Sequence, residues 1–194
     1  MNEKESIDQR WERIDSAIAA GYRNIDGLAI AQDGTVFHEA YFNGMKPTDR
    51  RHVASVTKSV ISALIGIEID EGKIESVDQR LSDFFPEYGW ARAREEKKRV
   101  AIRDLLTMTA PYPFGAWQEP LDKLCMQRDW TGYILDILGD GGADGSFKYS
   151  SGSAHLLSAV ISRATGMSAR EYANERLFAP LGIEPIEDRE MSAF

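Results

Sequence analysis

The sequence predicts an α+β fold in which a small antiparallel sheet precedes a mainly helical region. Two observations favour this class: an Asp-Gly turn between two apolar stretches near the N-terminus, and separate helical stripes of apolar residues farther along. A length of 194 residues with 43% apolar content fits one globular unit with a sizeable core. We therefore expect a single domain over 1–194, with an N-terminal part at 1–72 and a mainly helical part at 73–194.

The first two elements are a helix and a hairpin. Apolar residues recur at steps of four, three and four over residues 7–18, which predicts an amphipathic helix that Gly21 ends. The Asp-Gly pair at 33–34 supplies the positive φ of a tight turn. We therefore expect an antiparallel pair of strands at about 26–31 and 35–42.

The third element is a long helix at about 57–71, with Gly72 as its C-cap. Apolar side chains cover most of its circumference, and a helix that is apolar nearly all round is typically a buried one. Shorter helices are expected at 102–108, 130–138 and 153–166, and after the cap Ser168.

Composition excludes several classes of function. A net charge of −8 argues against a nucleic-acid partner, which needs a clustered basic face. No apolar run approaches the roughly 18 residues of a membrane helix, and the N-terminus lacks a signal-peptide stretch. The single cysteine, Cys125, cannot form an internal disulfide, so we expect a cytoplasmic location without a membrane partner. The scattered His38, His52 and His155 predict no metal site.

The candidate chemistry lies at the start of the long helix, where Ser55 and Lys58 stand three residues apart on one face. A serine hydroxyl is a poor nucleophile until a base takes its proton. Lysine accepts a proton only in its neutral form, which burial and the positive end of a helix dipole both favour. That end of the helix also points backbone N–H groups at an oxyanion. The simpler interpretation is that Ser55 merely caps the helix.

A second candidate is Tyr149, in a polar segment just before a predicted helix. A phenol held close to a lysine ammonium can share or relay its proton. The alternative is a buried tyrosine with a satisfied hydroxyl. The aromatic stretch at 112–117 is also open to two interpretations, a pocket wall or a separate hydrophobic cluster.

Four segments occur together in a fixed order along the chain. They are Ser55-Val56-Thr57-Lys58, Ile102 to Thr109, Tyr149-Ser150-Ser151-Gly152 followed by His155-Leu156-Leu157, and Leu177 to Gly182. Over about residues 26–183, their order and spacing resemble those of the serine β-lactamase-related hydrolases. These include class C β-lactamases, D-alanyl-D-alanine carboxypeptidases, family VIII esterases and 6-aminohexanoate-dimer hydrolases.

The resemblance implies a β-lactamase/penicillin-binding-protein-like (transpeptidase-like) fold and a role for each matched residue. Ser55 would be the acylated nucleophile, Lys58 its base, and Tyr149 the proton relay to the leaving group and from the deacylating water. The family usually carries a substrate-contacting asparagine where this chain has Ser151. We therefore expect a small ester or amide as substrate ahead of a β-lactam-like one, and no cofactor.

The resemblance also implies a late Lys/His-Thr/Ser-Gly element, which donates a second oxyanion N–H, and further strands that complete the sheet. Nothing after Ser151 matches that element, since Ala164-Thr165-Gly166 lacks the basic residue. Losing one oxyanion donor lowers the rate about 10²- to 10³-fold. We therefore expect an incomplete fold with weak or no hydrolase activity. The rival interpretation is a non-catalytic binding module, or half of a split hydrolase, whose exposed hairpin edge pairs with a second copy or a complementing chain.

Overall fold

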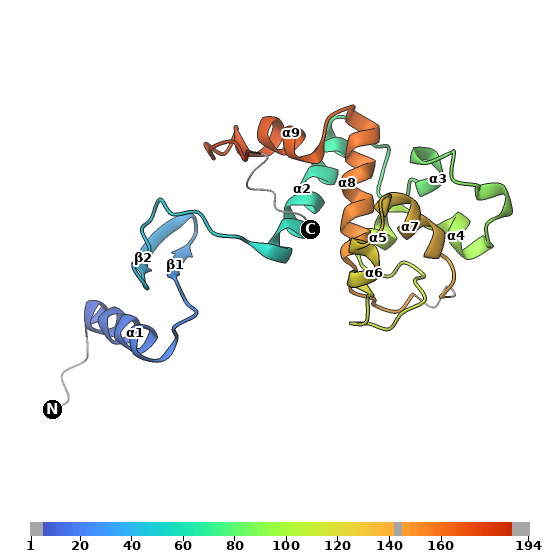
Figure 1. Cartoon of the computed structure of the whole chain (residues 1–194). Helices are drawn as coiled ribbons and strands as arrows, with labels where there is room; N and C mark the ends of the chain where they lie inside the picture. Colours follow the sequence, from blue (N-terminus) through green and yellow to red (C-terminus); the bar gives the residue numbers. More distant parts are fainter. Residues whose placement is uncertain (1–5, 142–144, 188–194) are drawn as a thin grey trace. The chain divides into compact units, whose positions relative to one another are not determined.

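A computed structural model describes residues 6–141 and 145–187 of the chain. The chain divides into two compact units, Met1–His52 and Val53–Phe194 (Figure 1). The long helix, placed with residues 1–72 in the division expected from sequence, falls within the second unit and packs against helices there.

The first unit contains the predicted helix and hairpin. Helix α1 (Ile7–Gly21) begins with a capping box in which the Ser6 hydroxyl accepts from the Gln9 N–H. Strands β1 (Gly27–Gln32) and β2 (Thr35–Tyr41) pair antiparallel, with an irregularity in register between Ile30 and Ala31. Among the described residues the sheet has these two strands alone. Both elements are confirmed, with ends shifted by one or a few residues.

The second unit is helical and is built around α8. Its elements are η1 (Ala54–Val56), α2 (Thr57–Asp70), α3 (Leu81–Phe84), η2 (Trp90–Arg92), α4 (Glu95–Arg99), α5 (Ile102–Leu106), α6 (Leu121–Cys125), α7 (Trp130–Ile137), α8 (Ser151–Thr165), α9 (Ala169–Ala173) and η3 (Asn174–Phe178). Helix α8 contacts α2 and α9 as well as α3, α5 and α7 (Figure 1). It therefore joins α2, which begins directly after the turn that contains the candidate serine, to the rest of the unit.

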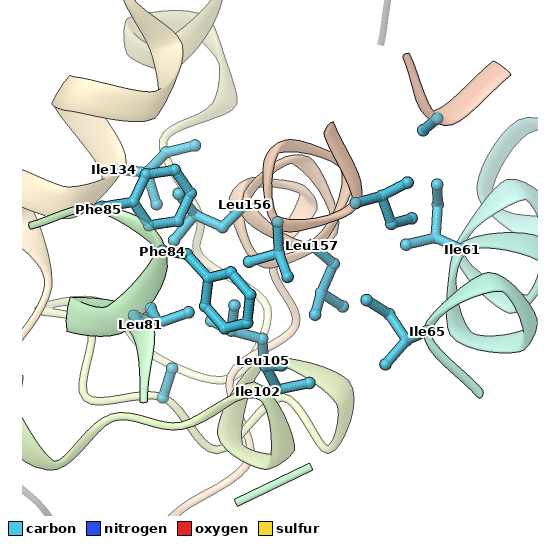
Figure 2. Packing of buried hydrophobic residues seen from close by; sticks show 14 of the residues in the cluster. Ile61, Ile65, Leu81, Phe84, Phe85, Ile102, Leu105, Ile134, Leu156 and Leu157 are labelled. Atoms are coloured by element: carbon cyan, nitrogen blue, oxygen red, sulfur yellow. The ribbon is translucent and has the colours of Figure 1, made fainter. Parts of the chain in front are cut away.

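The core lies on both sides of α8. Figure 2 shows Leu156 and Leu157 of α8 between the α2 side chains Ile61 and Ile65 and the side chains of α3. Leu156 has no exposed surface and Ile65 is 1% exposed. Burying a side chain of this size contributes about 1.5–3 kcal/mol, so this layer holds α2 against α8.

Helix α2 is buried along one side, so the expectation that it is buried all round is wrong. Its buried residues are Ile61, Leu64, Ile65 and Glu68. Ser62, Ala63 and Gly66 are exposed, because α8 and α9 cover only the opposite side of the helix. The C-cap is Glu71, and the predicted Gly72 follows it with a φ of +70°, the left-handed conformation that ends a helix.

Helix α8 begins at Ser151, two residues earlier than expected. Ser150 is its N-cap, and its hydroxyl accepts a hydrogen bond from the Ser153 N–H at 2.9 Å. Tyr149 therefore stands immediately before the cap. Within residues 6–141 and 145–187, no helix combines the length and hydropathy that a membrane span requires.

Candidate active site

Ser55 lies in the 3₁₀ turn η1, directly before α2. Val56 is the N-cap residue of α2, and no side chain caps this helix. The interpretation of Ser55 as a helix cap is therefore wrong, and its hydroxyl is available for other contacts. The preceding residue, Ala54, has a φ of +46°, a strained conformation for a residue with a side chain. Strain of this kind concentrates at functional sites.

Lys58 connects the start of α2 with the start of α8. Its Nζ donates to the Ser55 Oγ at 3.1 Å and to the Ser151 Oγ at 3.3 Å. The same Nζ lies 5.0 Å from the centroid of the Tyr149 ring. All four residues singled out in the sequence are thus brought together, although 93 positions separate Lys58 from Ser151.

Tyr149 is half-buried and faces this group. Hydrogen bonding with the Ser55 hydroxyl, together with the Lys58 ammonium, holds the pKa of Tyr149 below its ordinary value. Burial and the Glu119 carboxylate oppose this effect. A phenol whose pKa is lowered in this way gives up and accepts its proton more readily than a free tyrosine.

Glu119 holds the segment that carries Tyr149, and no motif or spacing in the sequence points to this role. Its carboxylate accepts from the Ser150 hydroxyl at 2.8 Å and from the N–H groups of Ser151 and Gly152 at 2.5 and 2.8 Å. A negative charge at this end of α8 is also favoured by the helix dipole. Glu119 therefore fixes the start of α8 beside Lys58.

Replacing Glu119 by alanine is expected to lower the free energy of unfolding by about 2 kcal/mol. The change leaves the buried Ser150 hydroxyl and the backbone donors of α8 without their acceptor, at about 1–3 kcal/mol for an unsatisfied group. Urea unfolding followed by far-UV circular dichroism measures the loss. Glu119→Gln keeps one acceptor oxygen and should lose less. The exposed Glu75 is the matched control, and an equal effect of Glu75→Ala would contradict the assignment.

The aromatic stretch at 112–117 fits both interpretations in part, since it contributes to the core and also reaches the candidate site. Tyr112 is 1% exposed, stacks on Phe114 at a centroid distance of 5.0 Å, and accepts from the Ser153 hydroxyl at 3.2 Å, so it belongs to the core. Trp117 is 73% exposed and stacks on the Tyr149 ring at 5.0 Å. Only Trp117 of the three therefore lies at the candidate site.

Two of the three histidines make their contacts with residues outside the candidate site. His38, in the first unit, bonds Asp15 through Nε2 at 2.9 Å. His155 bonds the Thr131 hydroxyl at 3.1 Å, and burial lowers the pKa of its imidazole. Across the described parts of the chain, no three His, Cys, Asp or Glu side chains form a group that could hold a metal ion.

Comparison with known proteins points to one family. The family model described as Beta-lactamase matches residues 8–187. The 6-aminohexanoate-dimer hydrolase of Paenarthrobacter ureafaciens is 25% identical over 174 residues, which cover 82% of this chain and 43% of that protein.

Solved structures give the fold. FmtA from Staphylococcus aureus matches with a TM-score of 0.67 and 19% identity, over 94% of this chain and 52% of that chain. A variant of simvastatin synthase from Aspergillus terreus matches with a TM-score of 0.59 and 19% identity, over 90% and 50%. The predicted β-lactamase/penicillin-binding-protein-like fold is thus confirmed. The chain spans about half the length of these relatives.

Proposed function

The chain belongs to the beta-lactamase family of serine hydrolases, and on that premise we propose that it forms an acyl-enzyme at Ser55. The observation that carries the proposal is the meeting of Ser55, Lys58 and Tyr149, with the Lys58 Nζ 3.1 Å from the Ser55 Oγ. A nucleophile and a base within hydrogen-bond reach are what acyl transfer requires.

In this proposal Lys58 first loses its ammonium proton to solvent, and its amine then takes the Ser55 proton as Oγ attacks the substrate carbonyl carbon. The carbonyl oxygen becomes an oxyanion beside the positive N-terminal end of α2, which favours negative charge. Tyr149 gives a proton to the leaving oxygen or nitrogen as its bond to the carbonyl carbon breaks. In the second half, Tyr149 takes a proton from water, the water oxygen attacks the acyl group, and Ser55 leaves and regains its proton from Lys58.

We propose small esters and amides as the substrate class, ahead of β-lactam-like molecules. Ser151 stands where the family usually has an asparagine, and its hydroxyl contacts Lys58 at 3.3 Å. A serine is shorter than an asparagine and carries one hydroxyl in place of an amide, so it contacts a substrate differently. The Paenarthrobacter relative is named as a hydrolase of a small dimer, which also supports a small-molecule substrate. We also propose a cytoplasmic location, because Cys125 is a free cysteine and disulfides are typical of proteins outside the cytoplasm.

The proposal is tested by hydrolysis of p-nitrophenyl acetate and p-nitrophenyl butyrate. Release of p-nitrophenol by the unchanged chain is expected to disappear in Ser55→Ala, because the acylated oxygen is gone. Ser59→Ala, one helical turn along α2 and exposed, should keep the rate. The expected rate is low, because nothing after Ser151 matches the late oxyanion element. Turnover that survives in Ser55→Ala would overturn the enzyme proposal, and no turnover in any of the three would favour the rival binding module.

A further inference from the structure

Large aromatic side chains gather on the surface beside the proposed nucleophile. Trp117 stacks on Tyr149 at a centroid distance of 5.0 Å with an interplanar angle of 22°. Phe147 also packs on Trp117, with ring centroids 5.5 Å apart and an interplanar angle of 55°. We call Trp117, Phe147 and Tyr149 the aromatic wall. Because Tyr149 also contacts Lys58, the wall adjoins the groups that would carry out acyl transfer.

The aromatic wall leaves much of its apolar surface open. Trp117 is 73% exposed and Phe147 is 45% exposed. Large aromatics are usually among the most buried side chains, since each can remove about 150–250 Å² from water. Trp117, stacked on Tyr149, and Phe147, packed on Trp117, therefore offer a surface that an apolar group can cover.

Backbone hydrogen bonds hold the two segments of the wall in place. The Tyr149 N–H donates to the Ala116 carbonyl at 2.7 Å, which ties the segment of Phe147 and Tyr149 to that of Trp117. The next residue back, Lys148, donates its N–H to the Met108 carbonyl, also at 2.7 Å. A wall that is formed before binding loses little conformational entropy when it takes a ligand.

The charged side chains near the aromatic wall are buried or make their hydrogen bonds with other residues. The Glu119 carboxylate accepts from three donors at the start of α8. Lys148, between the two outer members of the wall, is 6% exposed. Lys58 bonds Ser55 and Ser151. The wall itself therefore presents ring faces, which suit an uncharged group better than a carboxylate or an ammonium.

We propose that the aromatic wall is the acyl-group subsite of the hydrolase, and that it selects substrates with an uncharged, apolar acyl chain longer than acetyl. The inference rests on the proposed acyl-enzyme at Ser55 and narrows its substrate class. Each methylene that is fully buried changes binding about fourfold, and one laid against a single wall buries about half its surface, for about twofold. Four additional methylenes should thus raise the rate of acyl transfer roughly fifteenfold.

The test uses ethyl and hexyl fluorophosphonates, which differ by four methylenes and modify the serine covalently. The second-order rate of Ser55 modification is followed by intact-mass spectrometry. The hexyl probe is expected to react roughly fifteenfold faster. Trp117→Ala should bring the ratio close to one, while Trp117→Phe should keep most of the preference. Leu181→Ala, at a 63% exposed apolar residue after η3, is the matched control and should leave the ratio unchanged.

The outcomes separate the two proposals. If neither probe modifies Ser55, the acyl-enzyme proposal itself fails. If both probes modify Ser55 at the same rate, or if Trp117→Ala leaves the ratio unchanged, acyl transfer stands and the subsite is overturned. The aromatic wall would then be a surface that another part of a protein covers.

Discussion

Replacing Lys58 by methionine is expected to lower the rate of Ser55 modification about 10³-fold. Methionine preserves the length of the side chain and removes the amine that contacts the Ser55 Oγ at 3.1 Å. A positioned general base contributes about 10²- to 10⁴-fold, because the hydroxyl must lose its proton as it attacks. The measurement is the rate of covalent modification by a fluorophosphonate, read as the fraction of protein with added mass.

Two further variants distinguish the role of Lys58 as a base from the effect of its positive charge. Lys58→Arg keeps a positive charge but cannot accept a proton near neutral pH, so it should lose as much rate as Lys58→Met. Lys123→Met, at an exposed position on α6, makes the same chemical change away from the site and should keep the full rate. A Lys58→Arg protein with an unchanged rate would contradict the role of Lys58 as base, provided that circular dichroism shows both variants folded.

The second large effect is expected at Glu68, a carboxyl group buried in α2. It has no exposed surface, and neither carboxylate oxygen has a hydrogen-bond partner among the described residues. Burial is the main cause that raises the pKa of Glu68 from 4.5 to about 7, with Glu71 adding to the rise and Lys73 opposing it. Tyr172 of α9 is also near, since Glu68 contributes to the raised pKa of its phenol.

This pKa makes the stability of the fold depend on pH in a defined direction. The folded state holds the Glu68 proton more tightly than the unfolded state, so the full stability is present below about pH 4.5 and is lost as the pH rises to about 7. The loss amounts to about 3 kcal/mol. Glu68→Leu removes the charge, so its gain in unfolding free energy over the unchanged chain should grow by about 2–3 kcal/mol from pH 5 to pH 8.

Urea unfolding of both proteins at several pH values measures this gain. Glu75→Leu, at an exposed position, makes the same substitution outside the core and should change stability equally at pH 5 and pH 8. If the gain from Glu68→Leu is the same at every pH, Glu68 titrates as an ordinary carboxyl and the account of its burial is wrong.

Local patterns were sufficient to predict the elements that have their own start and stop signals. The Asp-Gly pair gave the hairpin between β1 and β2, and Gly72 gave the end of α2. The start of α8 was misplaced because Ser150 and Ser153 are both capable N-caps, and only the contact with Glu119 shows which one begins the helix. Choices of this kind depend on tertiary contacts.

The candidate site was predicted in part, for a similar reason. Ser55 and Lys58 are three residues apart, so helix geometry alone brings them together. Glu119 is 31 to 33 residues away in sequence from its hydrogen-bond partners, so no rule of local spacing predicts the contact. The position of Glu68 does carry a signal in the sequence: it falls three and four positions after Ile65 and Leu64, which places it on the core side of α2.

The most direct test of the account is to locate the covalent adduct. After reaction of the 194-residue chain with a fluorophosphonate, peptide mass spectrometry should find one modified residue, Ser55, and no modification in Ser55→Ala. An unmodified chain, or an adduct on a residue other than Ser55, would contradict the claim that the meeting of Ser55, Lys58 and Tyr149 forms an acyl-transfer site.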